Sequence, residues 1–526
     1  MKQLNLITKQ SDRTTQVERL AELQPLDIAV IGGGATGVGI ALDAAARGFK
    51  VALFERDDFG HGTSSRSTKL VHGGVRYLEQ GNVGLVREAL HERGLLLKNA
   101  PHVVHPLPTI VPLYQWWEGP YYTAGMKAYD LLAGKLGIER SRWLSKAKTL
   151  ELAPTLPRDK VRGGVRYFDG QFDDTRLLVH LVQTAILHDA VCLNYAEVRE
   201  IVHQQGRACG VVAVDRETGG ELRVDARVVI NAAGPFCDDV RRLEETPDSP
   251  LSARWIAASQ GAHVVLPQRF LPGDSAIIVP RTPDGRVVFA IPWLGRVLVG
   301  TTDIPLDHSP REPLAMPAEV DYLLETVADY LDPAPTRADV LSTFAGVRPL
   351  VQADPDAATS KLSREHEVRA SKTGLLSVIG GKWTTYRRMA EDAVDQAIEA
   401  GDLPKRPSPT AELPIFGATR RAVSPHDWPG VGELMAESPE LSELLSPDLP
   451  YTEAHVVWAA RGEQARTVED VLSRRTRALL LDAQAASDCA PRVAELLAAE
   501  LGRDAAWQSE QIASFQALAR RHVVVR

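Results

Sequence analysis

The sequence predicts an α/β protein that begins with a βαβ unit, continues with further short strands and ends in a helical C-terminal domain. Three observations lead to this prediction. Residues 27–59 read as a strand, a glycine-rich turn, a helix and a second strand, and residues 197–301 contain short strands separated by turn residues. After residue 402 the composition shifts to helix-forming residues. The 526 residues suffice for about two to four domains and a sizeable core.

The composition excludes several classes of protein. Hydrophobic residues make up 44% and charged residues 24% of the chain, which is typical of a globular protein and not of a disordered or fibrous one. The net charge of −8 provides no basic surface for whole-chain binding to nucleic acid. The four cysteines, Cys192, Cys209, Cys237 and Cys489, lack the C-x-x-C spacing of a metal or redox pair. We therefore expect reduced thiols, no nucleic-acid partner and no metal site.

The N-terminal segment, residues 1–26, is polar and lacks the apolar stretch of an export signal. No window of the chain reaches the roughly 18 uncharged apolar residues that a membrane-spanning helix needs. We therefore expect a polar leader at residues 1–26 and a cytoplasmic protein.

The first structural unit begins at Asp27. Ile28–Ile31 is rich in β-branched residues and predicts a strand, and Ala35–Arg47 predicts a helix that Gly48 ends. Val51–Phe54 predicts a second strand, which completes a βαβ unit.

The remaining elements follow from the same kind of pattern. Short strands are expected around the turn ETGGE and in the apolar segment ARVVINAAG. Further strands are expected at Gly261–Leu266 and Val287–Thr301, and helices at Glu319–Tyr330 and Thr384–Glu399. A proline-rich segment, GDLPKRPSPTAELP, then precedes the helical part of the chain. These features divide the chain into a leader at 1–26, a main region at 27–399 and a helical domain at 403–526.

Gly32, Gly34 and Gly37 form the pattern G-x-G-x-x-G between the first strand and its helix. Glycine at these positions lets the chain turn tightly, lets backbone N–H groups approach a pyrophosphate and lets the helix pack on the strand. Glu55 ends the second strand, where an acidic side chain can accept hydrogen bonds from both ribose hydroxyls of an adenine dinucleotide. This fingerprint predicts a dinucleotide site but does not separate NAD from FAD, because both contain adenosine diphosphate.

Two further segments are candidates for cofactor contact. Residues 60–79 are dense in Ser, Thr and Gly and offer donors suited to a pyrophosphate and a sugar-alcohol chain. The segment INAAGPF, residues 230–236, places small residues at a strand end where a cofactor can approach the backbone. A flexible surface loop is the alternative for the first segment, and a tight structural turn is the alternative for the second.

Five segments follow GGGATG in a fixed order along the chain: HGGVRYLE (72–79), INAAGPF (230–236), GTTD (300–303), AGVRPL (345–350) and GGKWTTYR (380–387). In this order they closely resemble the FAD-dependent glycerol-3-phosphate dehydrogenases, and the resemblance covers about residues 27–399. The segment RGEQARTVEDVLSRRTRALLLD, residues 461–482, is similar to the arginine-rich helical segment of the same family's C-terminal cap.

The resemblance implies an FAD-binding Rossmann-like domain of the glutathione-reductase or amino-acid-oxidase type, an antiparallel substrate domain and a C-terminal helical cap. The FAD-binding segments are expected at about 27–105, 155–255 and 340–399, and the substrate segment at about 256–339. The resemblance also implies oxidation of sn-glycerol 3-phosphate to dihydroxyacetone phosphate, with hydride passing to FAD and electrons to a membrane quinone. Two alternatives stay open: a glycerol-3-phosphate oxidase that uses oxygen, and a non-catalytic flavin-binding sensor or docking module.

The expected substrate site is basic, because a phosphate dianion needs charged donors. Arg348 and Lys382 lie beside proline and glycine, Arg76 lies two residues after Gly74, and all three are inside matching segments. Tyr77 and Thr301 offer hydroxyl groups.

Oxidation of the alcohol also needs a base, since the hydroxyl proton must leave as the hydride departs. His263 matches the position of a family active-site histidine, and Lys382 is the next candidate. The catalytic residues are therefore expected to be His263, Arg348 and Lys382.

The segment GGKWTTYR combines a glycine turn with a helix start, which would direct N–H groups at the pyrimidine side of the flavin. No motif for covalent flavin attachment is visible at residues 60–76, so we expect non-covalent FAD. The expected cofactor-binding residues are Gly32, Gly34, Gly37, Glu55, Thr63, Ser64, Ser65, Ser67, Lys69, Leu70, Gly73, Gly74, Ala233, Gly234, Gly381, Lys382 and Thr384.

Residues 114–143 contain Trp116, Trp117, Tyr121 and Trp143 among lysines and arginines. This mixture suits a helix at a membrane interface, and an ordinary amphipathic helix packed on its own domain is the equal alternative. The family resemblance favours peripheral attachment at the inner face of the cell membrane, with the quinone pool as partner. The sequence leaves a homo-oligomer open.

Overall fold

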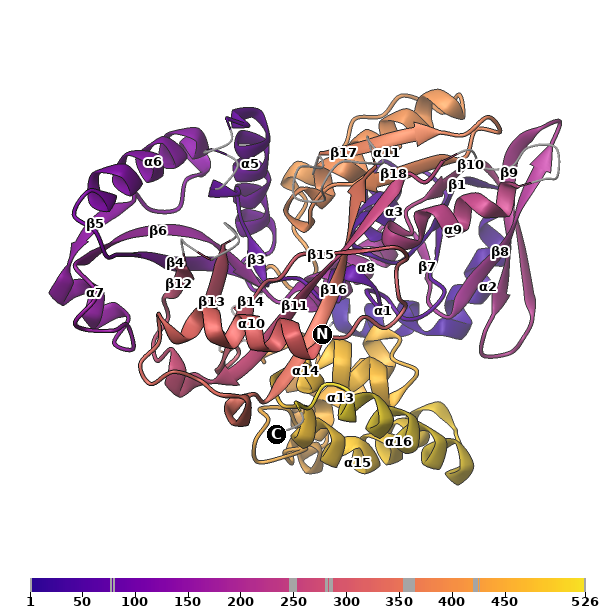
Figure 1. Ribbon diagram of the computed structural model, residues 1–526. Helices are drawn as coiled ribbons and strands as arrows, with labels where there is room; N and C mark the ends of the chain where they lie inside the picture. Colours follow the sequence, from indigo (N-terminus) through magenta and orange to yellow (C-terminus); the bar gives the residue numbers. More distant parts are fainter. Residues whose placement is uncertain are drawn as a thin grey trace.

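The computed structural model describes residues 2–75, 78, 81–245, 253–279, 282, 287–352, 365–419, 424 and 426–524. Two sheets lie side by side, and a helical domain packs beneath them (Figure 1). The fold is thus the expected α/β architecture with a second sheet and a C-terminal helical domain.

The described residues place eight strands in the first sheet, in the order β17-β18-β10-β1-β2-β7, with β8 and β9 added beside β10. The strands from β18 to β7 are parallel, whereas β17, β8 and β9 pair antiparallel. Their bounds are β1 Leu26–Ile31, β2 Val51–Phe54, β7 Val191–Leu193, β8 Ala196–Gln204, β9 Arg207–Asp215, β10 Glu221–Asn231, β17 His366–Ala370 and β18 Leu376–Gly380.

Helices α3 (Ala35–Ala46), α8 (Asp174–Leu187) and α11 (Tyr386–Ala400) pack on one face of this sheet. Because successive side chains of a strand point to opposite faces, Ile28 and Val30 join these helices, while Ala29 and Ile31 face β8, β9 and α2 (Arg13–Leu23). The sheet is therefore buried on both faces, as its parallel strands require.

Ten strands of the described residues form the second sheet, in the order β15-β11-β14-β13-β12-β4-β6-β3, with β16 on β11 and β5 on β6. The pairing is antiparallel except between β12 and β4. The bounds are β3 Leu70–Val71, β4 Val104–Leu113, β5 Arg142–Ser145, β6 Gly163–Phe172, β11 Ile256–Pro267, β12 Ala276–Val279, β13 Val288–Trp293, β14 Arg296–Gly300, β15 Ile304–Leu306 and β16 Ser342–Val351.

This sheet draws strands from well outside residues 256–339. It includes β3–β6 and β16, because strand pairing depends on contacts far apart in the sequence. The segment Val287–Thr301 is extended as expected, but a turn that was not predicted divides it: β13 and β14 form a hairpin whose turn has positive φ at Leu294 (47°) and Gly295 (76°). Gly295 was the sequence signal for that turn.

The other helices surround the two sheets. Helices α5 and α6 pack against each other beside β4 and β6, α7 packs on β5 and β6, and α10 packs on β11. The bounds are α5 Val83–Asn99, α6 Glu118–Ala133, α7 Lys146–Leu152, α9 Cys237–Arg241 and α10 Pro317–Ala328. Helices α10 and α11 agree with the expected helices to within two residues at each end.

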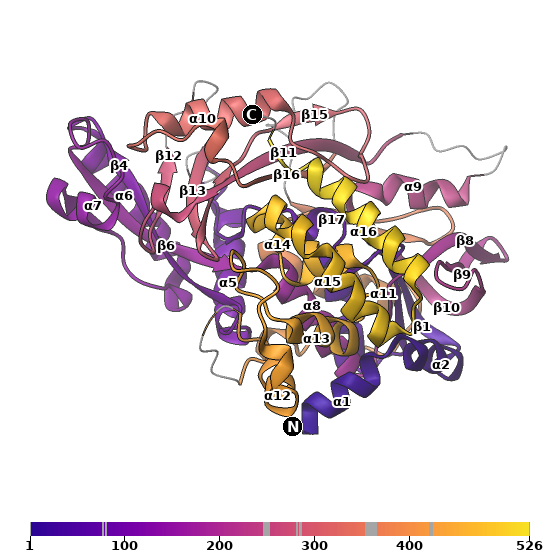
Figure 2. The ribbon, with the colours of Figure 1, turned by 90° about the horizontal axis from the view of Figure 1, so that it is seen from below.

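The C-terminal domain contains helices α12–α16 and a π-helical turn at Asp470–Arg475, and Figure 2 shows it from below. It packs on α8, on β16 and on α1 (Lys2–Ser11). The bounds are α12 Val431–Glu437, α13 Glu453–Glu463, α14 Ala478–Leu481, α15 Ala483–Leu501 and α16 Ala505–Arg520. None of the helices in the described ranges is long and apolar enough to cross a membrane.

The polar leader folds into α1 and α2, which dock on the first sheet. Gln16 is buried, and its side-chain oxygen accepts a hydrogen bond from the Cys192 backbone at 2.8 Å. Arg13 pairs with Asp215 through two bonds of 3.0 Å and donates to the carbonyl oxygen of Asn194. The docked face mixes these polar residues with the buried Ile7 and Leu20, so hydropathy alone did not identify it.

We expect Arg13→Met to lower the free energy of unfolding by about 3 kcal/mol, because it leaves Asp215 without its bidentate partner at a buried position. Arg19→Met is the matched control in the same helix. Arg19 pairs with Asp189, whose side chain is 83% exposed, so this change should cost less than about 1 kcal/mol. Denaturant unfolding of both variants checks the difference, and equal losses would contradict the structural role given to Arg13.

Candidate functional site

A cavity of ≈ 340 Å³ lies at the carboxyl ends of the parallel strands β1, β2, β10 and β18. Its lining includes Gly32 after β1, Glu55 after β2, Ala233 after β10 and Gly381 after β18. Crevices at this edge of an open α/β sheet are where such folds bind ligands. The volume lies within the range of small-molecule and cofactor pockets.

The glycine turn directs the N-terminus of α3 into this cavity. Gly32 has a φ of 110°, and a Cβ on it would lie 2.7 Å from the carbonyl oxygen of Ala232. A Cβ on Gly37 would lie 1.9 Å from the carbonyl oxygen of Gly32, so Gly37 acts in helix packing and is not a lining residue. Gly34 lines the cavity, and next to it the backbone N–H of Ala35 donates to Ser64 Oγ at 2.9 Å. The helix start is suited to an anionic group.

Glu55 lies at the end of β2 with its carboxylate on the cavity wall. Its two oxygens accept from the backbone N–H groups of Gly33 at 2.5 Å and Asp57 at 2.8 Å. Burial raises the pKa of Glu55 to about 7, although the two backbone bonds oppose the rise. A carboxylate held in this way has lone pairs left for ligand hydroxyl groups.

The turn after β10 is pinned by Asn231. Its side-chain amide donates to the carbonyl oxygen of Cys237 at 2.9 Å, and its oxygen accepts from the N–H of Ala233 at 3.2 Å. Ala233 and Gly234 thus line the cavity with little side-chain bulk. The segment INAAGPF is therefore both a tight structural turn and part of the cavity wall that a cofactor could contact.

The loop after β2 divides into two parts. Thr63 and Ser64 line the cavity, and Thr63 also donates to the carbonyl oxygen of Val347 on β16 at 2.5 Å. Ser67 and Lys69 turn away from it to Asp174, at 2.7 and 2.6 Å.

Lys69 is fully buried, and burial lowers its pKa to about 7 despite Asp174. Gly73 donates its N–H to the hydroxyl of Tyr129, and Thr384 Oγ1 accepts from the N–H of His72. The structure does not place Ser65, Ser67, Lys69, Leu70, Gly73, Gly74 or Thr384 among the lining residues.

The segment GGKWTTYR closes one side of the cavity. Lys382 and Trp383 line it, and the Trp383 indole donates to the carbonyl oxygen of Ser64 at 2.9 Å. The Trp383 ring also packs edge-on against Phe172 and Tyr386. The large side chain of Trp383 is therefore accommodated. Its hydrogen bond connects the segment after β18 to the loop after β2, and both segments line the cavity.

His263 lies on β11, between Gly300 of β14 and Phe344 of β16. Its ring stacks on Phe344 with centroids 4.6 Å apart, and Nε2 is 3.0 Å from Thr68 Oγ1. The side chain is 2% exposed, and burial, then Lys69, then Arg348 hold the pKa of His263 well below 6.5. This imidazole is neutral at physiological pH.

Arg348 lies on β16 opposite Ser259 of β11. Its Nη2 donates to Thr301 Oγ1 and to the carbonyl oxygen of Thr302, both at 3.0 Å. Its Nη1 donates to Asp303 at 3.2 Å and to the carbonyl oxygen of Gln260 at 3.3 Å. The guanidinium is thus fixed in place. The segments GTTD and AGVRPL meet here, although about 45 residues separate Arg348 from Thr301 and Asp303.

Arg76 and Tyr77 lie outside the described residues. The cavity also has charged lining residues that the sequence analysis did not select: Arg56, Asp57, Glu197, Arg199, Asp239 and Arg311. These residues lie outside recognisable motifs, so no sequence signal distinguished them from surface charges.

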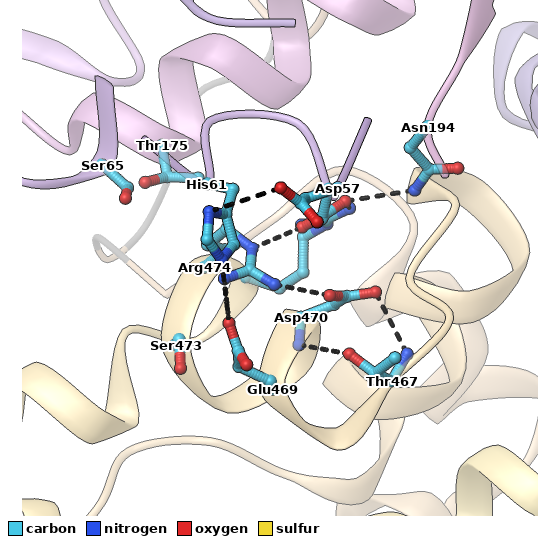
Figure 3. Close-up of polar contacts among 12 residues, drawn as sticks. Asp57, His61, Ser65, Thr175, Asn194, Thr467, Glu469, Asp470, Ser473 and Arg474 are labelled. Carbon is cyan, nitrogen blue, oxygen red and sulfur yellow. Dashed lines mark hydrogen bonds and ion pairs between the residues drawn. The ribbon is translucent and has the colours of Figure 1, made fainter. Parts of the chain in front are cut away.

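Three potential metal ligands meet beside the cavity. Donor atoms of His61, Glu312 and Glu469 lie within 4.8 Å of one another, and Figure 3 shows His61 facing Glu469. Arg66 pairs with Glu312 at 2.8 Å and Arg474 pairs with Glu469 at 2.7 Å. Both carboxylates are already neutralised by guanidinium groups, which explains the cluster without an ion.

Comparisons with known proteins agree with this arrangement. The family profile described as FAD dependent oxidoreductase matches residues 27–387, and the profile described as the C-terminal domain of alpha-glycerophosphate oxidase matches residues 428–508. A mitochondrial glycerol-3-phosphate dehydrogenase of Arabidopsis thaliana is 41% identical to this chain, covering 93% of the chain and 85% of the relative. The human mitochondrial enzyme of that name is 40% identical, covering 95% of the chain and 74% of the relative.

The chain belongs to the family of FAD-dependent glycerol-3-phosphate dehydrogenases. A glycerol-3-phosphate dehydrogenase from Bacillus halodurans, solved in complex with FAD, superimposes with a TM-score of 0.75 at 29% identity, covering 96% of this chain and 97% of that one. FAD is accordingly the cofactor of this family member. The cavity fits it: a helix N-terminus suits the pyrophosphate, a buried carboxylate suits the ribose, and the strand ends carry small residues.

We expect Gly34→Val to abolish FAD retention. A Cβ at this position lies 3.1 Å from Ser64 Oγ, and the branched side chain would project into the cavity at the start of α3. The visible absorbance of the purified variant measures bound flavin. The control is Gly84→Val in α5, where nothing lies within 4 Å of the Cβ position, and it should keep its flavin. A yellow Gly34→Val protein would show that FAD binds elsewhere.

Proposed function

We propose that this protein oxidises sn-glycerol 3-phosphate to dihydroxyacetone phosphate while FAD occupies the cavity at the carboxyl ends of β1, β2 and β10. The names of the relatives support the substrate. The observation that carries the proposal is the position of Lys382. Its cationic side chain belongs to a residue that lines the cavity. Arg348 is not itself a lining residue, but its chain neighbour Pro349 is, so Arg348 lies next to the cavity wall.

Arg348 and Lys382 are proposed to bind the substrate phosphate, with Arg76 as a third donor. The contacts of the Arg348 guanidinium within the described residues include one carboxylate, one hydroxyl and two carbonyl groups. A phosphate dianion would exchange with the longest neutral contact, the carbonyl oxygen of Gln260, because a charged acceptor makes the stronger hydrogen bond. Thr301 accepts a hydrogen bond from the same guanidinium, so it would lie beside the bound substrate.

His263 is proposed as the base that takes the proton of the substrate hydroxyl. Its lowered pKa keeps a lone pair available, and stacking on Phe344 holds the ring in one plane. Thr68 engages Nε2, which leaves Nδ1 as the second nitrogen for proton transfer. FAD supplies the hydride acceptor when it is bound.

The electron acceptor is proposed to be a membrane quinone. An oxidase that passes electrons to oxygen is the second candidate, and the match of residues 428–508 to a domain named after alpha-glycerophosphate oxidase favours it specifically. Oxygen uptake and reduction of a quinone analogue, both measured with glycerol 3-phosphate, separate the two. Loss of the flavin absorbance on anaerobic addition of glycerol 3-phosphate separates both enzymes from a non-catalytic flavin-binding module.

The exposed aromatic surface around α6 is proposed to contact a lipid bilayer. Met126, Tyr129 and Ala133 are buried and attach the helix to its own domain. Trp116 and Leu131 are each 81% exposed, and Trp143 of β5 is 57% exposed, with Lys135 and Arg142 exposed nearby. Aromatic rings with basic neighbours suit the headgroup region. The helix thus combines packing on its domain with a surface suited to a membrane.

We expect His263→Ala to slow anaerobic flavin reduction by about 10²–10⁴-fold, the usual contribution of a positioned base, while FAD stays bound. The wild-type rate should stay level as pH falls from 8 to about 6.5 and decline only below that, because the lowered pKa of His263 delays protonation. Stopped-flow absorbance measures both. His203→Ala, which changes an exposed histidine of β8, is the control. A variant that keeps the wild-type rate and pH profile would exclude His263, leaving Lys382 as the candidate.

Replacing Trp116, Leu131 and Trp143 together by Ser should remove binding to vesicles of phosphatidylethanolamine and phosphatidylglycerol, because it removes the apolar groups that insert. Reduction of a soluble dye by glycerol 3-phosphate should be unchanged. The control is Leu444→Ser, which changes a 57% exposed leucine of the C-terminal domain. Co-sedimentation of the triple variant at the wild-type level would contradict the proposal.

A further inference from the structure

The loop after β2, residues 57–69, lines one side of the cavity with its first half and contacts the C-terminal domain at Asp58 and Ser65; we name it the cofactor loop. Its residues Asp57, Gly60, His61, Gly62, Thr63 and Ser64 line the cavity. Figure 3 shows Asp57 and His61 of this loop facing Arg474 and Glu469 of the C-terminal domain. More than 400 residues separate the two segments in sequence.

The first anchor of the cofactor loop is Asp58, which is fully buried. Its Oδ2 accepts from Arg474 Nε and Arg475 Nη1, both at 2.6 Å. Its Oδ1 accepts from Arg475 Nη2 at 2.9 Å and from the Asn194 amide at 3.1 Å. Burial alone would raise the pKa of Asp58, but Arg475 and Arg474 outweigh it and hold the pKa well below 3.8.

The second anchor is the backbone of Ser65. Its carbonyl oxygen accepts from Arg477 and from Lys69 Nζ. Arg477, which is 1% exposed, also pairs with Asp174 at 3.1 Å. The lining residues Gly60–Ser64 therefore lie between Asp58 and Ser65, the two residues of the loop to which arginines of the C-terminal domain donate hydrogen bonds.

The arginines reach the loop because of the local shape of their own segment. Arg474 and Arg475 belong to the π-helical turn Asp470–Arg475, and Arg477 follows it with a φ of 62°. Glu463 and Asp470 balance their charges from within the C-terminal domain, at 3.7 Å from Arg475 and 2.5 Å from Arg474. π-helical turns of this kind are frequent at functional sites.

We propose that the C-terminal domain holds the cofactor loop in its FAD-binding shape, with Arg474, Arg475 and Arg477 as positioning residues. The arginine-rich segment acts within the chain, since all three side chains are at most 3% exposed and cannot dock an external partner. The inference rests on the proposed placement of FAD in the cavity. Because coupling between two sites is reciprocal, FAD binding must in turn stabilise the contact between loop and domain.

Two variants remove one anchor each and leave the remaining charges paired. Asp58→Asn removes the charge of the first anchor, while Arg474 retains its ion pair with Asp470 and Arg475 retains its ion pair with Glu463. Arg477→Met removes the second anchor, while Lys69 still neutralises Asp174.

Arg466→Met is the matched control for these variants. Arg466 makes a bidentate pair with Glu217, at 2.6 and 2.8 Å, which joins the same domain to the turn between β9 and β10 instead of to Asp58 or Ser65.

Titration of each apoprotein with FAD should show a dissociation constant raised at least about tenfold in Asp58→Asn and in Arg477→Met, the effect of losing charge-assisted hydrogen bonds. The dissociation constant of Arg466→Met for FAD should stay within about twofold of the wild-type value. This should hold even if the thermal unfolding temperature of Arg466→Met falls as far as that of the two anchor variants. An unchanged dissociation constant in both anchor variants would overturn the proposal.

Hydrogen exchange on the unaltered chain tests the same coupling if a variant fails to fold. FAD added to wild-type apoprotein should slow amide exchange at residues 57–65 and at residues 466–477. Slowing at 57–65 alone would overturn the proposal. The Gly34→Val variant separates the two ideas: if it keeps FAD, the placement of the cofactor fails, whereas if it loses FAD and both anchor variants bind normally, only the positioning role fails.

Discussion

The close contact between the end of β1 and the first turn of α3 is the constraint on which the site depends. A Cβ at Gly37 would lie 1.9 Å from the carbonyl oxygen of Gly32, so the helix can approach the strand this closely only where residue 37 is glycine. Residue 32 must be glycine as well, because its φ is 110° and its own Cβ would lie 2.7 Å from the carbonyl oxygen of Ala232. This approach directs the helix N-terminus at the cavity, where backbone N–H groups favour an anion. Glu55 and Ala233 then face the same space from the ends of the neighbouring strands, because parallel strands end at one edge.

Balanced buried charges connect this edge to the rest of the molecule. Asp58, Asp174 and Glu463 would each be costly to bury alone, and each faces a guanidinium or ammonium group. Removal of one partner therefore costs more than the pair contributes, since the remaining charge is left in a poorly solvated place. These pairs join the cofactor loop, α8 and the C-terminal domain, which makes the helical domain part of the architecture of the cavity.

Periodicity and motifs predicted the local elements of the cavity well. The βαβ unit, the glycine fingerprint and helix α11 follow from short-range patterns, because turns, caps and helix faces depend on neighbouring residues. The same reasoning did not find that Ser67 and Lys69 turn to Asp174, more than 100 residues away. It also treated residues 1–26 as a plain leader, because two of the residues through which α2 docks, Arg13 and Gln16, are polar.

The sequence by itself determined the family, the cofactor class and the segments from which the site is built, because ordered motifs record local requirements of backbone geometry and charge. Only the tertiary structure decided which side chains of those segments meet. His263 stacks on Phe344, and Arg348 is held by Thr301 and Asp303. Arginines of the C-terminal domain donate hydrogen bonds to the cofactor loop. The reason is that these contacts join residues far apart in the chain, and their partners are set by strand register and domain packing, which no short pattern contains.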